Sequence, residues 1–125
     1  MDKTNTLELL KFILNSISLI KRRFKNINKS DDFLFSDDGL DKLDAISMRL
    51  QAIGEALKNI HKRDKDFLFL VNDKLYWSKI IKTREILTHH YIDIDADIIF
   101  TICDEKIEEL EINIIKLKDI INNKV

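Results

Sequence analysis

The sequence predicts an all-α protein, a single domain (1–125) built as an up-and-down bundle of four to five helices. The 125 residues contain no proline and only two glycines, the residue types that interrupt helices and mark turns. Apolar residues recur at spacings of three, four and seven, as they do along one face of an α-helix. With 45% hydrophobic residues, a chain of this length has enough apolar material for one core.

The first two helices are predicted from their apolar stripes. One runs from about Asn5 to Asn28 and the other from about Gly39 to His61. Between them, the segment Ser30–Asp38 holds four aspartates and two serines, which is typical of a loop whose end caps the next helix. The two stripes consist of Leu7, Leu10, Leu14, Ile17 and Phe24, and of Leu40, Leu43, Ile46, Leu50, Ile53, Leu57 and Ile60.

Two further helices are predicted in the second half of the chain. The third covers about Asp73 to His89, and the fourth runs from an N-cap at Asp95 to about Ile121. The apolar run Phe67–Val71 is too short for its periodicity to distinguish a strand from a buried helical turn. We favour a helical turn, because no second strand exists to pair with this run.

Composition excludes several classes of protein. The 21 basic residues nearly balance the 22 acidic ones, so the molecule as a whole has no field that attracts nucleic acid, and any basic site is local. The single cysteine, Cys103, has no partner for an internal disulfide. No apolar run approaches the roughly 20 residues that a membrane span needs. We therefore expect a cytoplasmic protein.

Basic residues gather in two segments. Five lie between Lys21 and Lys29 with no acid among them, and the predicted third helix carries Lys74, Lys79, Lys82 and Arg84. Such blocks are usually solvated faces. The third helix differs from the other block because its cations share the segment with two of the three histidines. This helix is therefore the candidate for a functional site.

The end of the third helix reads "REILTHHY", from Arg84 to Tyr91. Cleavage of RNA without a metal needs a group that titrates near neutral pH to take the proton of a ribose 2′-hydroxyl, and a fixed cation to neutralise charge on the phosphate oxygens. Histidine and arginine provide these two groups. The residue types therefore suit the cleavage of RNA, with His89 as base or acid and Arg84 as the phosphate-binding cation.

The spacing of these residues constrains how they meet. On a regular helix, Arg84 and His89 lie about 140° apart around the axis and about 7.5 Å apart along it, whereas Tyr91 returns to within about 20° of Arg84. Arg84 and His89 therefore reach one phosphate only if Arg84 bends around the helix, the helix end unwinds, or a second subunit completes the site. A cleft shared by two copies of this helix is the simplest of the three.

The same residues match a known signature. Arg84, His89 and Tyr91 form the pattern R-x4-H-x-Y, which resembles that of the HepT-like toxins of the HEPN superfamily. The stretches "LDAISMRLQAIGEALKNI" (43–60) and "YWSKIIKTREILTHHYIDID" (76–95) are similar to two further segments of that family. Together they cover close to half of the chain in the expected order.

This resemblance implies a HEPN-like helical bundle that acts as a metal-independent ribonuclease without a cofactor. It further implies a homodimer with two motifs in one cleft, neutralised by an MntA-like nucleotidyltransferase antitoxin in a type VII-like pair. Arg84 and His89 would be catalytic, and the antitoxin would attach AMP to Tyr91. Lys79 and Lys82 are the expected contacts to the RNA backbone. We expect no metal site, since His89, His90 and Cys103 lack any recognised ligand spacing.

One departure from the family pattern keeps other functions open. Glu85 follows the arginine where the family usually has asparagine or another small polar residue, and a carboxylate here can pair with Arg84 and compete with phosphate. The alternatives are a non-catalytic HEPN module that binds a nucleotide or a nucleotidyltransferase partner, and a helical interaction protein with no site. Two residues have structural interpretations: Gly54 as a point of close helix approach, and Cys103 as a core residue.

Overall fold

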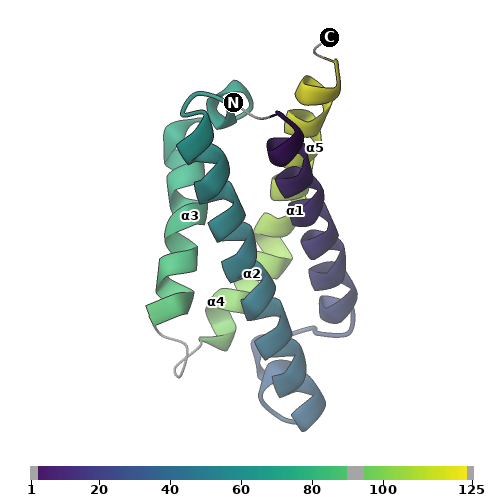
Figure 1. Cartoon of the computed structure of the whole chain (residues 1–125). Helices are drawn as coiled ribbons and strands as arrows, with labels where there is room; N and C mark the ends of the chain where they lie inside the picture. Colours follow the sequence, from purple (N-terminus) through teal and green to yellow (C-terminus); the bar gives the residue numbers. More distant parts are fainter. Residues whose placement is uncertain (1–2, 90–94, 124–125) are drawn as a thin grey trace.

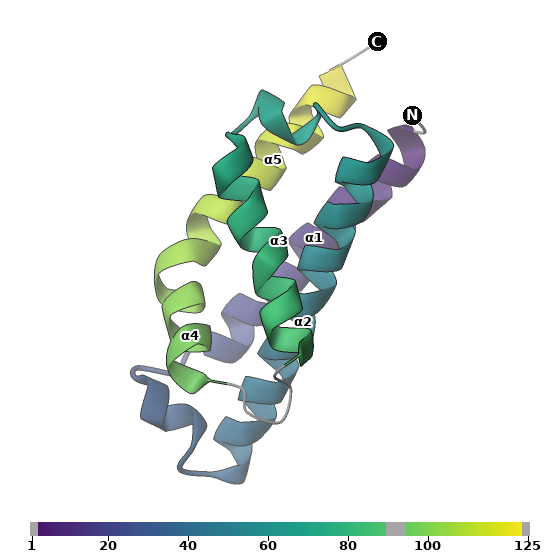
Figure 2. The ribbon, with the colours of Figure 1, turned by 90° about the vertical axis from the view of Figure 1, so that its left-hand side faces the viewer.

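The computed structural model describes residues 3–89 and 95–123 and shows an up-and-down helical bundle. The helices are α1 (Lys3–Phe24), α2 (Asp37–Arg63), α3 (Lys74–His89), α4 (Ala96–Thr101) and α5 (Ile107–Asn123). In Figures 1 and 2, α1, α2 and α3 alternate in direction, and α4 and α5 together form a fourth arm. The described ranges contain no strand. The predicted all-α bundle is confirmed.

The connection between α1 and α2 is more ordered than a plain loop. Helix α1 ends at Phe24, four residues earlier than predicted, and Ile27 is buried from the turn that follows. A 3₁₀ turn, η1 (Ser30–Phe33), then places Phe33 in the core. The Ser36 side chain caps α2 by accepting a hydrogen bond of 3.0 Å from the Gly39 backbone N–H. The predicted cap at the end of this segment is confirmed.

The short apolar run before α3 is helical, as predicted. It contains the 3₁₀ turn η2 (Leu68–Leu70), in which Leu68 is buried while Phe69 and Leu70 are exposed. The Trp77 indole N–H donates a hydrogen bond of 2.8 Å to the Leu68 carbonyl oxygen and is itself buried. This contact fixes η2 against the first turns of α3.

The predicted fourth helix is wrong as a single regular helix. A π-helical segment, η4 (Ile102–Lys106), separates α4 from α5, and the Ile107 backbone N–H donates to the Ile102 carbonyl. Both Cys103 and Ile107, at either end of this wide turn, are buried in the core. The predicted N-cap is confirmed, because the Asp95 carboxylate accepts hydrogen bonds from the first turn of α4.

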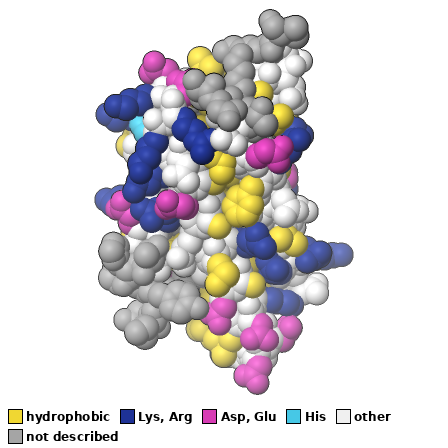
Figure 3. Space-filling model, in the orientation of Figure 1, with side chains coloured by type: hydrophobic (Ala, Val, Ile, Leu, Met, Phe, Trp, Pro, Cys, Tyr) yellow, Lys and Arg dark blue, Asp and Glu magenta, His cyan; other side chains and the backbone are white. Residues whose placement is uncertain are grey.

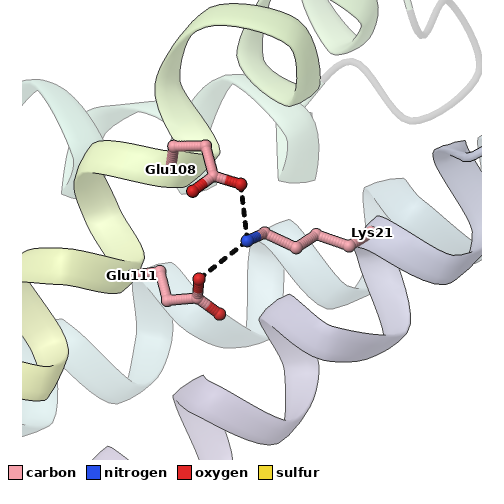
Figure 4. Close-up of polar contacts among 3 residues, drawn as sticks. All are labelled: Lys21, Glu108 and Glu111. Atoms are coloured by element: carbon pink, nitrogen blue, oxygen red, sulfur yellow. Dashed lines mark hydrogen bonds and ion pairs between the residues drawn. The ribbon is translucent and has the colours of Figure 1, made fainter.

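The basic block that begins at Lys21 is partly neutralised by the acidic start of α5. The Lys21 Nζ lies 2.6 Å from Glu108 Oε1 and 2.7 Å from Glu111 Oε1 (Figure 4). Hydrogen bonds to Glu108 and then to Glu111 raise the pKa of Lys21. This pair of contacts ties the end of α1 to α5 and gives Lys21 a structural role.

The helices share one contiguous apolar core, and none of the helices in the described ranges is long and apolar enough to cross a membrane. Within the bundle, α3 packs mainly against α2. Figure 1 shows α2 between α3 and α1, and in Figure 2 α3 lies in front of the bundle. One side of α3 therefore faces solvent, and the arginine and histidine of the motif are carried on this peripheral helix.

Candidate functional site

Arg84 lies on the side of α3 that packs against α2. A Cβ atom at Gly54 would lie 2.5 Å from the Arg84 Cβ and 3.2 Å from its Cγ. Since real Cβ atoms do not approach other atoms to 2.5 Å, only glycine permits this separation of the two helices. The predicted role of Gly54 as a point of close helix approach is confirmed. The residue that packs against it is Arg84, the candidate catalytic arginine.

Two carboxylates flank the Arg84 guanidinium. The Arg84 Nη1 lies 3.2 Å from Glu55 Oε2, and its Nη2 lies 3.9 Å from Glu85 Oε1. The sequence drew attention to Glu85, but Glu55 is nearer and was missed as a partner. Both carboxylates are more than half exposed, so each pair contributes about 1 kcal/mol or less to stability. Their main effect is to orient the guanidinium.

The motif histidine lies at the end of the same helix. Helix α3 continues to His89, so its backbone does not unwind between the two motif residues. The separation of about 140° expected on a regular helix therefore applies to the backbone positions of Arg84 and His89. The side chain of His89 and all of Tyr91 fall outside the described part of the chain. Their contacts stay predictions.

The two predicted RNA-contacting lysines line different depressions. Lys82 borders a hollow between α3 and the end of α2. Lys79 lines a separate cavity of about 420 Å³ between α3 and the arm formed by η4 and α5. Spacing of three residues places them on neighbouring stripes of the helix, and each stripe faces a different depression. Their contacts to RNA stay predictions.

Tyr76 and Cys103 are not suited to proton transfer at neutral pH. Burial raises the pKa of Tyr76, whose ring meets Trp77 edge-on with 4.9 Å between ring centroids. Burial also raises the pKa of Cys103 to about 12. The thiol is buried, so the predicted core position of Cys103 is confirmed. Both groups remain protonated and serve packing.

The described ranges contain no group of three His, Cys, Asp or Glu side chains placed to hold a metal ion. Acidic residues of α5 instead pair with Lys21, and Glu55 and Glu85 face Arg84. The polar chemistry around α3 is thus that of an arginine fixed between carboxylates, with a histidine five positions later on the same helix.

Comparisons with known proteins identify a family and a relative of the chain. A family model described as "Ribonuclease HepT-like" matches residues 13–117. The chain is also 29% identical over 110 residues to a Methanocaldococcus jannaschii protein named "Gamma-glutamylcyclotransferase and putative RNase". That match covers 88% of the chain but only 46% of the archaeal protein, so the chain spans about half of its relative's length. No solved structure gave a significant match.

Proposed function

Because the chain belongs to the HepT-like ribonuclease family, we propose that it is a metal-independent endoribonuclease and the toxin of a type VII-like toxin–antitoxin pair. The observation that carries this proposal is the position of Arg84. Gly54 allows its backbone to lie directly on α2, and Glu55 holds one end of its guanidinium. An arginine oriented in this way suits the recognition of a phosphate group.

In the proposed reaction, His89 removes the proton from a ribose 2′-hydroxyl, and the resulting oxygen attacks the adjacent phosphorus. The bond from phosphorus to the 5′-oxygen breaks, and that oxygen takes up a proton from the protonated histidine or from water. The products are a 2′,3′-cyclic phosphate and a 5′-hydroxyl end. Arg84 neutralises charge that builds on the phosphate oxygens, and Lys82 and Lys79 bind the RNA backbone on either side of α3.

The site is proposed to form between two copies of the chain. On one regular helix, Arg84 and His89 point in directions about 140° apart, which does not favour a shared phosphate. In a homodimer with two-fold symmetry, α3 of each copy faces the other, and Arg84 of one copy then meets His89 of its partner. The peripheral position of α3, which packs mainly against α2 within the chain, supports a contact with a second copy.

One observation favours the second candidate function, a non-catalytic module that binds a nucleotide or a nucleotidyltransferase. Glu55 and Glu85 both lie within 4 Å of the Arg84 guanidinium. A substrate phosphate must therefore share this arginine with two carboxylates, which weakens phosphate binding. In the non-catalytic function, the same face recognises its ligand without cleaving it.

An RNA cleavage assay in EDTA separates the two functions. We expect the wild-type protein to cleave single-stranded RNA and leave 2′,3′-cyclic phosphate ends. The Arg84→Gln variant, which keeps a shorter polar side chain without the charge, should cleave about 10²-fold more slowly, as when one stabilising donor of a transition state is lost. Product ends are identified by mass spectrometry. Equal cleavage by both proteins, or by neither, would reject the ribonuclease.

The proposed antitoxin is an MntA-like nucleotidyltransferase that transfers AMP to the Tyr91 hydroxyl, in the cytoplasm where RNA is cleaved. AMP adds negative charge and bulk near the phosphate-binding arginine, so it repels RNA and fills the cleft. After incubation with this enzyme and ATP, the intact mass of the protein should rise by one AMP group and its RNA cleavage should stop. The Tyr91→Phe variant should gain no mass, and labelling that persists in it would place the modification elsewhere.

A further inference from the structure

A hollow of about 510 Å³ is lined by residues from the end of α2, from η2 and from α3. Its inner wall includes the buried side chains of Leu68 and Trp77, which the indole hydrogen bond locks together. At its rim, the Phe69 ring remains 38% exposed and lies 5.7 Å from the His61 ring between centroids. The hollow thus offers an aromatic surface on a rigid base.

Positive charge surrounds this hollow. Lys65, Lys74 and Lys82 line it, against one acid, Glu85. Within the ranges that the structure describes, none of the three lysines forms an ion pair with a carboxylate. Figure 3 shows lysine and arginine side chains gathered around a histidine over the upper part of α2 and α3. In a chain with a net charge of −1, this is a local concentration of cations.

The hollow adjoins the candidate catalytic arginine. Glu85 lines it and also lies 3.9 Å from Arg84 Nη2, so this carboxylate connects the hollow with the arginine next to it. Lys82 stands one helical turn before Glu85 on this side of α3. A chain of phosphates that leaves Arg84 along α3 therefore passes Lys82 and reaches Phe69 and Lys74.

We propose that this hollow binds a nucleotide of single-stranded RNA next to the scissile phosphate. The base stacks on Phe69, and Lys65, Lys74 and Lys82 hold the flanking phosphates. Proteins bind single strands by this combination of an aromatic platform and a basic groove. The hollow lies within the size range of small-molecule sites. The inference rests on the proposed ribonuclease function and names where its substrate lies.

Charge favours RNA over a second copy of the chain as the occupant. Exposed Phe69 and Leu70 are also suited to a protein interface, but the cores of such interfaces are depleted of lysine. Here three lysines line the hollow itself. Contact between two copies would bring these like charges together, whereas a strand of phosphates neutralises them.

Substitutions at Phe69 test the stacking platform. The probe is a short single-stranded oligonucleotide of 2′-O-methyl RNA, which lacks the hydroxyl that cleavage requires, and binding is followed by fluorescence anisotropy. Loss of one stacked base predicts that Phe69→Ala weakens binding by about 5- to 150-fold. Phe69→Tyr, which keeps a ring, should bind like the wild type. Phe35→Ala removes a phenylalanine that is 73% exposed elsewhere and should change nothing.

Substitution of a lysine tests the phosphate contacts. Lys74→Ala should weaken binding and lower the slope of log affinity against log salt by about one. Lys116→Ala, which removes an exposed lysine of α5, is the matched control and should leave both quantities unchanged. On cleavable RNA, Phe69→Ala and Lys74→Ala should raise KM while kcat stays near the wild-type value.

The other outcomes either overturn the proposed binding site or separate it from the ribonuclease function. Unchanged binding by Phe69→Ala would overturn it, as would an equal loss in Phe35→Ala. If Phe69→Ala instead converts a dimer to a monomer in sedimentation experiments, the hollow is an interface between copies. If the wild type does not cleave RNA yet binds the 2′-O-methyl probe in a way that depends on Phe69, the proposed ribonuclease function is rejected and the proposed binding site is retained. A wild type that neither cleaves nor binds RNA rejects both.

Discussion

A His89→Ala variant is expected to cleave RNA about 10²- to 10⁴-fold more slowly than the wild type, the usual contribution of a general acid or base. Alanine removes the imidazole that accepts the 2′-hydroxyl proton, while α3 keeps its helix-forming tendency up to its last residue. Initial rates on a fluorogenic single-stranded RNA in EDTA measure the effect. Because phosphate contacts by Arg84 and the lysines are retained, KM should change far less than kcat.

The neighbouring histidine provides a matched control for this experiment. His90→Ala removes the same side chain one residue later, and we expect it to keep cleavage near the wild-type rate. An equal loss in both variants would contradict the assignment of His89 as the base. A rate that falls only in His90→Ala would assign the role of base to His90. The angle around the helix between the base and Arg84 would then change as well.

The same variant tests the shared cleft. In a mixture of equal amounts of His89→Ala and Arg84→Gln proteins that exchange subunits, a site built from two copies is intact in mixed dimers only. About a quarter of the wild-type activity should then return, since half of the dimers are mixed and each has one complete site. If each copy contains its own Arg84 and His89, no activity returns, and the dimer is not needed for chemistry.

Much of the fold could be predicted because helical periodicity is a local property. The stripe of α2 fixed its ends to within two residues of the structure, Asp37–Arg63 against Gly39–His61. The end of α1 was overestimated because Ile27 is buried although it lies beyond the helix. The π-helical turn before Ile107 could not be predicted from the sequence. Cys103 and Ile107 are both buried and lie four positions apart, a spacing that is also typical of a regular helix.

The candidate site was only partly predictable. The motif identified Arg84 as a functional residue, and the sequence itself places Glu85 next to it. The contact of Arg84 with Gly54 and Glu55 joins residues 30 and 29 positions apart, and it depends on how α2 is rotated relative to α3. One signal was present: a glycine inside a helix needs a close neighbour, and the glutamate beside it faces the same helix.

The contact between Gly54 and Arg84 leads to the second large expected effect. Gly54→Ala should lower cleavage by about 10²-fold, the cost of displacing a catalytic group by about 1 Å. The new methyl group would lie 2.5 Å from the Arg84 Cβ, so α3 or the arginine must move away from α2. Overpacking of this kind costs about 1–3 kcal/mol, which exceeds or offsets the gain of about 1 kcal/mol in helix propensity from glycine to alanine. Urea unfolding and RNA cleavage measure the two effects.

The effect of Gly54→Ala in an Arg84→Gly protein shows whether the clash with Arg84 causes the loss of stability. In Arg84→Gly protein the Cβ that meets the new methyl group is gone, so adding Gly54→Ala should raise the free energy of unfolding by about 1 kcal/mol. In the wild-type background the same substitution should lower it or leave it unchanged. A rise of equal size in both backgrounds, together with full cleavage by Gly54→Ala, would show that the two helices separate freely. Arg84 would then owe its position to Glu55 and not to the close approach at Gly54, and Glu55→Gln would become the substitution that displaces it.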